Sequence, residues 1–183
     1  MSERSVLALT GYAGTGKTTI SEYLKNKYGF VVVEGSALIR QIASEAGETL
    51  SLRRDYEEAF RTIQRVRGRA WIAETLLGLD DERLLQVGLR AEADLLRLKE
   101  IGGLVIALTC LPEVCLKRMN QNNPKSPHSL EEYAEHLIND DSPDEFGYGS
   151  HTSWCVAKAD YHLDTSSESV EETFAEIDSL LAQ

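Results

Sequence analysis

The stretch GYAGTGKTT, residues 11–19, decides the fold because it sets three glycines and a lysine at fixed spacing. It matches the pattern G-x-x-x-x-G-K-[ST]. The apolar run Val6–Leu9 precedes it, and a segment of helical periodicity, Thr18–Lys27, follows it. In this strand–loop–helix context, successive backbone N–H groups and the positive end of the helix surround a phosphate group. The sequence therefore predicts a phosphate-binding P-loop.

The residue types of this loop point to a nucleoside triphosphate with its metal ion. The Lys17 ammonium neutralises the terminal phosphates, and the Thr18 hydroxyl is a ligand that phosphate-bound Mg²⁺ takes. We therefore expect ATP and Mg²⁺ as cofactors, with Thr18 as the metal ligand. The expected ATP-binding residues of the loop are Gly11, Ala13, Gly14, Thr15, Gly16, Lys17, Thr18 and Thr19.

The composition excludes several classes of protein. The chain carries 19 Lys and Arg residues against 30 Asp and Glu residues, a formal net charge of −11, which repels the phosphates of nucleic acids. Three cysteines without a C-x-x-C pair indicate neither a disulfide framework nor a zinc site. The sequence has no signal-peptide core and no apolar run near the roughly 20 residues of a membrane crossing. We expect a soluble, cytoplasmic protein with small-molecule partners and no nucleic-acid or membrane partner, and the oligomeric state stays open.

Short apolar runs alternate with longer segments of helical period along the chain. This β-α-β order predicts an α/β fold of three layers, in which helices cover a parallel sheet. Because the chain has no internal repeat and no linker, residues 1–183 are expected to form a single domain. The segment S-L-E-E places Ser129 and Glu132 in a capping box at the start of a helix. The expected strands are 6–9, 30–33, 84–87, 104–108 and 159–163, and the later helices are 53–67, 112–119, 129–138 and 170–181.

A P-loop leaves the reaction open among kinases, GTPases and ATP-driven motors. The sequence contains no N-K-x-D guanine motif, and its length leaves no room for the lever domains of a motor. A small kinase needs cationic groups for its acceptor and a lid that excludes water. We therefore expect a P-loop NTPase fold of the nucleotide kinase type, with acceptor-binding helices at about 35–78 and a small lid at about 119–153. The acidic pair Asp140 and Asp141 within this lid is either a hinge cap or a solvated loop.

Six of the twelve arginines lie between residues 53 and 69, a local concentration of positive charge in an acidic protein. Within the expected helix 53–67, Arg54, Arg61 and Arg65 share one face. Two interpretations stay open for each of them: binding of an anionic acceptor, or ion pairs with glutamates on a solvated face. The apolar stripe of this helix is expected to consist of Ala59, Ile63 and Val66.

Three further charged residues stand near expected strand ends. Arg40 closes the segment E-G-S-A-L-I-R after the second strand, and Arg90 closes V-G-L-R after the third. Open α/β sheets bind ligands at the carboxyl ends of their strands, so both arginines are expected near a bound ligand. Glu34 ends the second strand, which is expected to lie directly beside the P-loop strand. Its carboxylate either orients Mg²⁺-bound water, accepts a proton from an acceptor hydroxyl, or belongs to a surface turn.

Four segments carry a resemblance to a known family. G-Y-A-G-T-G-K-T-T is similar to its P-loop, and E-G-S-A-L-I-R to the start of its acceptor-binding segment. V-G-L-R-A-E-A-D-L-L looks like its D-G-x-R-x-x-x-E element, and A-D-Y-H-L-D-T-S like its A-D-Y-x-I-x-N segment. Over nearly its whole length the chain resembles the nucleotide kinases of the adenylate kinase and dephospho-coenzyme A kinase type, most closely the kinase-like members of archaea and phages.

The resemblance implies roles for individual residues. Arg40 and Arg90 would grip the acceptor phosphate, Arg118 would lie near the lid, and Thr165 with Ser166 would border the adenine. With the arginines of the helix 53–67 included, the expected acceptor-binding residues are Ser36, Arg40, Arg54, Arg65 and Arg90. The expected catalytic residues are Lys17, Glu34, Arg90 and Arg118.

Two departures from the family pattern leave the strength of catalysis open. Val87 stands where the family carries an aspartate that holds Mg²⁺ through water. The expected lid is poor in arginine, with Cys115 and Asn122 at arginine positions and Arg118 nearly alone. We expect ATP-dependent phosphoryl transfer to a small phosphorylated acceptor, a nucleoside or deoxynucleoside monophosphate. The alternatives are a dephospho-coenzyme A kinase-like activity and a nucleotide-binding regulatory protein with little catalysis.

Overall fold

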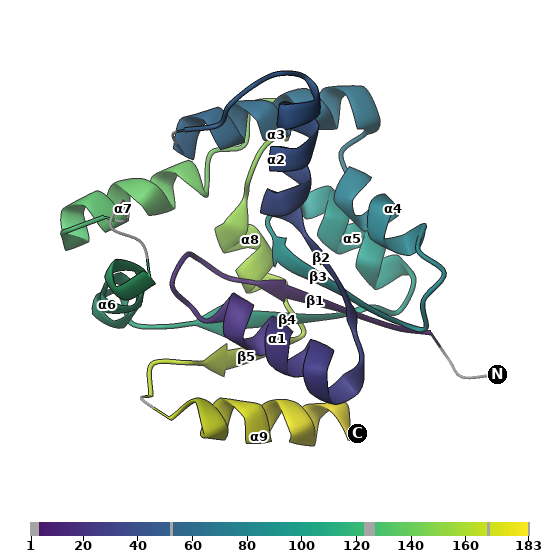
Figure 1. Ribbon diagram of the computed structural model, residues 1–183, viewed down its shortest axis with the longest axis vertical. Helices are drawn as coiled ribbons and strands as arrows, with labels where there is room; N and C mark the ends of the chain where they lie inside the picture. The colour runs from purple at the N-terminus through teal and green to yellow at the C-terminus, as the bar shows by residue number, and fades with distance from the viewer. Residues whose placement is uncertain (1–3, 52, 123–126, 168, 183) are drawn as a thin grey trace.

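A parallel sheet of five strands, in the order β2-β3-β1-β4-β5, runs through the centre of the part of the chain that the computed structural model describes (Figure 1). That part comprises residues 4–51, 53–122, 127–167 and 169–182, so residues 123–126 of the expected lid lie outside it. Every pair of neighbouring strands is parallel, as the β-α-β order of the sequence predicts. The strands are β1 (Ser5–Thr10), β2 (Val31–Glu34), β3 (Arg83–Leu89), β4 (Leu104–Thr109) and β5 (Tyr161–Asp164).

Strand β3 occupies the position between β1 and β2. Leu84 pairs with Val6 on one side and with Val31 on the other. The expectation that the strand of Glu34 lies directly beside the P-loop strand is therefore wrong. The reason is burial, because β3 is buried on both faces from Leu84 to Val87, whereas β2 is short and partly exposed and so suits the edge of the sheet.

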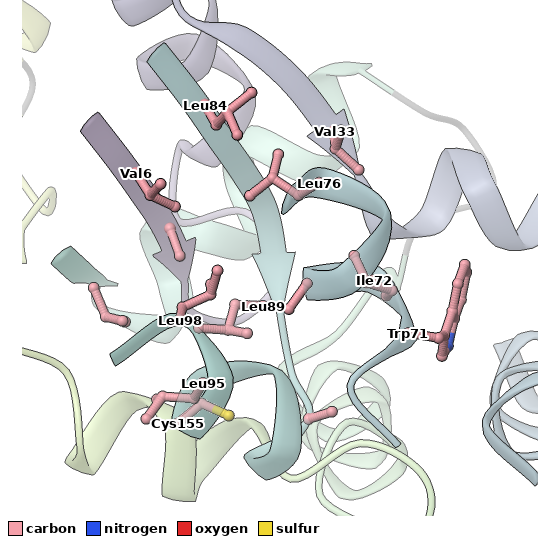
Figure 2. Close-up of a cluster of buried hydrophobic side chains, with 14 of the residues drawn as sticks. Val6, Val33, Trp71, Ile72, Leu76, Leu84, Leu89, Leu95, Leu98 and Cys155 are labelled. Carbon is pink, nitrogen blue, oxygen red and sulfur yellow. The ribbon is translucent and has the colours of Figure 1, made fainter. Parts of the chain in front are cut away.

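Helices on both faces of the sheet complete the expected three layers (Figure 1). Helices α1 and α9 cover one face, and α4, α5 and α8 cover the other. Side chains along β1 alternate between these layers: Leu7 and Leu9 pack with α1 and α9, whereas Val6 and Ala8 pack on the opposite face. Figure 2 shows part of the cluster of buried hydrophobic side chains on this opposite face, which includes the buried indole of Trp71. These helices are α1 (Lys17–Tyr28), α4 (Trp71–Leu77), α5 (Glu92–Glu100), α8 (Thr152–Ala157) and α9 (Val170–Leu181).

The remaining described helices connect the expected acceptor region with the expected lid. α2 follows the carboxyl end of β2, α3 packs against both α2 and α7, and α7 packs against α6. The Ser129 hydroxyl accepts a hydrogen bond from the Glu132 backbone N–H at 3.1 Å, which confirms the expected start of α7. None of the helices in the described ranges combines the length and the apolar composition needed to cross a bilayer. The four helices are α2 (Gly35–Glu45), α3 (Arg53–Arg67), α6 (Pro112–Asn122) and α7 (Leu130–Asn139).

The inner face of α3 is partly polar. Ile63 is buried as expected, but Val66 is 81% exposed, so the expected apolar stripe is wrong at that position. Glu57 and Gln64 are buried instead, and their spacing of seven residues places them on one helical face. Both accept hydrogen bonds from the segment 149–151. α3 therefore turns these two polar side chains inward beside the buried Phe60 and Ile63, because a polar segment lies against that part of the helix.

A buried carboxylate fastens the start of α4. Asp94 on α5 is fully buried, and its Oδ1 accepts a hydrogen bond from the backbone N–H of Ala73 at 2.9 Å. The N-cap residue of α4, Ala70, has no side chain that could accept such a bond. Burial raises the pKa of Asp94 to about 7, and the hydrogen bonds from the α4 backbone oppose this rise. Asp94 thus replaces a local helix cap with a tertiary one.

Candidate active site

The P-loop adopts a backbone conformation that depends on its glycines. Gly14 and Gly16 have φ angles of 83° and 90°, which L side chains rarely adopt. A Cβ atom at Gly14 would lie 2.7 Å from the carbonyl oxygen of Cys115 and would push α6 away. At Gly16 an added Cβ atom would meet nothing within 4 Å. Because Gly16 is also the N-cap of α1, the open side of the loop faces the free N–H groups of a helix N-terminus.

The Lys17 ammonium group lies against its own loop. Its Nζ donates hydrogen bonds to the carbonyl oxygens of Gly11 at 2.7 Å and Tyr12 at 2.6 Å. The Thr15 hydroxyl donates to the same Tyr12 oxygen at 2.9 Å. A positive charge is therefore held beside the first turn of α1, where the helix dipole already favours an anion.

A cavity of about 620 Å³, here named the large cavity, opens beside the P-loop. Its volume lies in the range of small-molecule sites. Its walls come from the P-loop with α1, from α6, and from the segment between β5 and α9. Ser167, Ser169 and Thr173 belong to this lining, although no motif in the sequence marks them. The expected ATP-binding residues that line it are Ala13, Gly14, Gly16, Lys17, Thr18, Thr19, Arg118 and Thr165.

The three other expected ATP-binding residues, Gly11, Thr15 and Ser166, support the walls of the large cavity. The Gly11 carbonyl holds the lysine of the loop. The Thr15 carbonyl accepts a hydrogen bond from the Thr165 hydroxyl at 3.0 Å. The Ser166 hydroxyl accepts one from the Leu111 N–H at 2.9 Å. These bonds join the P-loop, the end of β5 and the start of α6 into one frame.

Arg118 reaches the large cavity from α6. Its guanidinium donates to the carbonyl oxygens of Thr165 at 2.6 Å and Ser167 at 3.3 Å. It also lies 3.4 Å from Sγ of Cys110. The bonds hold a cation on the cavity wall and connect α6 with the segment after β5. A role for Arg118 in ATP binding stays a prediction that this position favours.

A second cavity, of about 90 Å³ and here named the small cavity, adjoins the large one. Its walls come from β2, α2, α3, α4, the end of β3 and Ser150. Lys17, Thr18 and Arg90 line both cavities, so the two spaces meet at these three side chains. The other residues that line the small cavity are Glu34, Gly35, Ser36, Ile39, Tyr56, Glu57, Phe60, Ile72, Val87, Gly88 and Ser150.

The acidic pair at the end of α7 contacts residues of this site. Arg90 Nη1 donates to Asp140 Oδ1 at 2.8 Å, and the Asp140 side chain is 3% exposed. Asp141 accepts hydrogen bonds from the Tyr12 hydroxyl and, at 2.7 Å, from the Ser153 N–H. Burial and the neighbouring carboxylate raise the pKa of Tyr12. Of the two interpretations of the pair, the solvated loop is excluded, since both carboxylates tie the end of α7 to the site.

Glu34, Ser36 and Arg40 form a polar group at the small cavity. Ser36 Oγ donates to Glu34 Oε1 at 2.5 Å, and Arg40 Nη2 lies 3.9 Å from the same oxygen. Arg40 is also 3.4 Å from the hydroxyls of Ser36 and Tyr56. Glu34 and Ser36 line the cavity, and Arg40 borders it through them. The Glu34 carboxylate therefore faces the same space as Lys17, although its side chain is 48% exposed.

Arg54 and Arg65 lie away from this group. Arg54 is 79% exposed and 3.8 Å from Asp55, and neither arginine is among the described residues that line the two cavities. Arg65 donates to Asp144 at 2.8 Å and lies over the ring of Tyr148. The structure thus brings Ser36, Arg40 and Arg90 together as expected but leaves these two expected acceptor-binding residues apart.

Sequence reasoning missed Glu57 and Ser150 as site residues. Glu57 is 6% exposed, lines the small cavity, and its Oε1 accepts a hydrogen bond from the Ser150 hydroxyl at 2.9 Å. The two residues are 93 positions apart and lie in no motif. The sequence offers one indication that is recognisable only once the structure is known. A glutamate on the inner face of α3 conflicts with the amphipathic pattern of that helix.

The residues present fit Mg²⁺ that arrives with a bound phosphate. In the described ranges, no group of three or more His, Cys, Asp and Glu side chains is placed to hold a metal ion. Val87, where the sequence resemblance leads one to expect an aspartate, lines the small cavity as a buried apolar side chain. The Thr18 hydroxyl lies where the two cavities meet. Mg²⁺ commonly combines one or two protein ligands with phosphate oxygens and water, which is what this donor set allows.

Comparison with known proteins identifies the family. A family model described as "AAA domain" matches residues 7–139. The chain belongs to this AAA domain family. Shikimate kinase from Acinetobacter baumannii, in complex with shikimate, has the same fold, with a TM-score of 0.63 and 18% identity over 99% of this chain and 94% of that one. The α/β P-loop kinase fold expected from the sequence is thereby confirmed.

Two curated relatives are similar in sequence over shorter stretches. Cytidylate kinase from Methanocella arvoryzae is 42% identical over 45 residues, which are 25% of this chain and 26% of that protein. Shikimate kinase from Chlorobium limicola is 28% identical over 125 residues, 65% of this chain and 57% of that protein. The chain thus matches less than two thirds of the length of either relative. The narrower likeness to kinases of the adenylate and dephospho-coenzyme A type stays a prediction.

Proposed function

We propose that this AAA domain protein is a kinase that transfers the γ-phosphoryl group of ATP to a small acceptor held in the small cavity. The observation that carries the proposal is that Lys17, Thr18 and Arg90 line both cavities. A nucleotide whose phosphates lie on the P-loop would present its terminal phosphate at this junction. An acceptor in the small cavity would meet it there, which is the arrangement that direct transfer requires.

The chain's own residues would act mainly by position and charge. The P-loop N–H groups and Lys17 would hold the phosphates, and Arg90, oriented by Asp140, would neutralise charge on the group in transfer. Mg²⁺, held by Thr18, would supply further charge neutralisation. Arg118 would fix the donor from the other side of the large cavity. Glu34, which lines the small cavity, would accept the proton if the acceptor attacks through a hydroxyl.

A nucleoside or deoxynucleoside monophosphate is the first candidate for the acceptor. Arg90 at the junction and Arg40 at the border of the small cavity offer two cations for its phosphate, and a cytidylate kinase is among the relatives. In that case the attacking atom is a phosphate oxygen, which carries no proton to remove at neutral pH. Glu34 would then orient groups and not act as a base.

A hydroxyl-bearing acceptor without phosphate is the second candidate. The observation that favours it is that Glu34 lines the small cavity together with Lys17, because a hydroxyl nucleophile benefits from a nearby base. Shikimate kinases, whose name denotes such an acceptor, are similar both in sequence and in fold.

The test is ATP turnover by the purified protein with a panel of acceptors. The panel contains the common nucleoside and deoxynucleoside monophosphates, dephospho-coenzyme A, shikimate and gluconate, and Lys17→Ala serves as the inactive control. Turnover with one class that is lost in the control would support the proposal and select the acceptor. Tight ATP binding without turnover on any member would replace it with the nucleotide-binding regulatory function.

A further inference from the structure

The small cavity has an uneven distribution of charge. Lys17 and Arg90 lie where it meets the large cavity, and Asp140 already balances Arg90 at 2.8 Å. The described residues that line the small cavity alone contribute two carboxylates, Glu34 and Glu57, and no cation. Away from the junction, the described lining of the small cavity is therefore acidic, and Arg40, 3.9 Å from Glu34, borders it from outside.

Glu57 is held in place within that wall. The hydroxyl of Ser150, itself fully buried, donates to Glu57 Oε1 at 2.9 Å. The apolar side chains of Phe60 and Ile72 line the same cavity. A carboxylate that is 6% exposed among apolar groups interacts with a ligand more strongly than one in water, because the local dielectric constant is low.

We infer that Glu57 selects the acceptor by accepting a hydrogen bond from it, so the acceptor carries a hydroxyl or amino group at that point. A phosphate or carboxylate placed against Glu57 would meet a buried negative charge and be rejected. A phosphorylated acceptor would direct its phosphate to Arg90 and its donor group to Glu57. The amino group of a nucleobase and the ring hydroxyl of a small acid share this chemistry. The inference rests on the proposed kinase function and narrows its substrate class.

The experiment measures kcat/KM for matched pairs of acceptors with the wild-type protein and with Glu57→Gln. CMP and UMP differ by an amino group against a carbonyl, as do 5-methyl-dCMP and dTMP, and shikimate is paired with analogues that lack one ring hydroxyl. Wild-type protein should prefer the member with the C4 amino group, or with the complete set of ring hydroxyls, by roughly tenfold to a hundredfold, the size of a charged hydrogen bond. Uracil and thymine offer a donor only at N3, which is one atom away from that position. Glu57→Gln should reduce that preference by roughly tenfold, since the amide can present either a donor or an acceptor.

Glu58→Gln is the matched control, because Glu58 is the next residue on α3 and is exposed. It should leave the preference unchanged. Glu57→Asp keeps the charge but shortens the side chain, so it should keep the preference while raising the acceptor KM. This variant carries the test if Glu57→Gln folds poorly, which thermal unfolding and ATP affinity would reveal.

The outcomes separate the inference from the proposed function. Wild-type protein that turns over no acceptor overturns both. Wild-type turnover with equal rates for both members of every pair overturns the selection by Glu57 alone. An equal loss of kcat/KM for both members of a pair in Glu57→Gln also overturns the inference, since an equal loss would reveal a structural role of Glu57. A preference within the nucleotide pairs or within the shikimate pair identifies which class of acceptor donates the hydrogen bond to Glu57.

Discussion

The large cavity takes much of its lining from one continuous stretch, the P-loop and the first turn of α1, whereas the small cavity collects its lining from six separated parts of the chain. The first is built largely from backbone conformation, and the second from side chains such as Glu34, Glu57 and Arg90. This difference shows which part of a binding site can be predicted from the sequence. A local motif encodes backbone geometry directly, but side chains converge only when the sheet order and the helix packing are known.

The largest expected effect tests the junction of the two cavities. Lys17→Ala should lower turnover by roughly a hundredfold to a thousandfold, because it removes a preorganised positive charge from the phosphates. The free energy of unfolding should change little, since the ammonium contacts carbonyl oxygens of the P-loop and not the apolar core. Steady-state kinetics and thermal unfolding measure the two quantities. Wild-type turnover in this variant would contradict the P-loop assignment.

Glu34→Gln sharpens the comparison from the side of the small cavity. If the acceptor attacks through a hydroxyl, turnover should fall by roughly a hundredfold while both substrates still bind, because the variant keeps the size of the side chain and loses the base. Single-turnover rates and equilibrium binding separate the two effects. Full activity with a hydroxyl acceptor would remove Glu34 from the chemistry.

Arg90→Ala and Arg40→Ala should weaken the acceptor by roughly tenfold to a hundredfold while ATP affinity barely moves, since a charge-assisted pair is worth about 1.5 to 3 kcal/mol. Arg90→Ala also leaves the buried Asp140 carboxylate without its arginine and should destabilise the protein. The double variant Arg90→Ala/Asp140→Asn should recover stability but not acceptor affinity. A larger loss of ATP affinity than of acceptor affinity would move these arginines to the donor side.

The pH dependence of stability tests the role of Asp94, which holds α4 in place behind the small cavity. Its folded pKa of about 7 lies above the ordinary value of 3.8, so between these pH values the folded protein keeps a proton that the unfolded chain releases. The free energy of unfolding should therefore fall as pH rises through this window and level off above pH 7. Asp94→Asn should remove about 2 kcal/mol of that dependence between pH 5 and 7. Thermal unfolding at several pH values would reveal it, and identical slopes in both proteins would contradict it.

The smallest expected effect concerns the outer face of α3. Arg54→Ala should change the acceptor KM by less than about threefold, because an exposed ion pair contributes little. Steady-state kinetics with the best acceptor of the panel provides the measurement. A loss of tenfold or more would instead support the sequence-based prediction that Arg54 binds the acceptor, and would extend the small cavity to that face.

Much of the fold followed from local patterns. The alternation of apolar runs and helical segments predicted the parallel sheet and its layers, and Ser129 predicted the start of α7 correctly. The order of the strands did not follow, because pairing depends on which strand is buried on both faces. The predicted apolar stripe of α3 was wrong at Val66 for a similar reason. The segment that packs against the inner face of α3 lies more than 80 residues further along the chain.

The sequence by itself determined the P-loop and predicted the class of ligand that it binds, because spacing along one short stretch dictates the backbone conformation and the position of Lys17. Only the tertiary structure decided which side chains line the small cavity together. The fold inserts β3 between β1 and β2, brings Arg90 to Asp140, and places Glu57 against Ser150. Those contacts join residues 50 and 93 positions apart. Their energies come from burial and charge in three dimensions, which no local pattern of residues encodes.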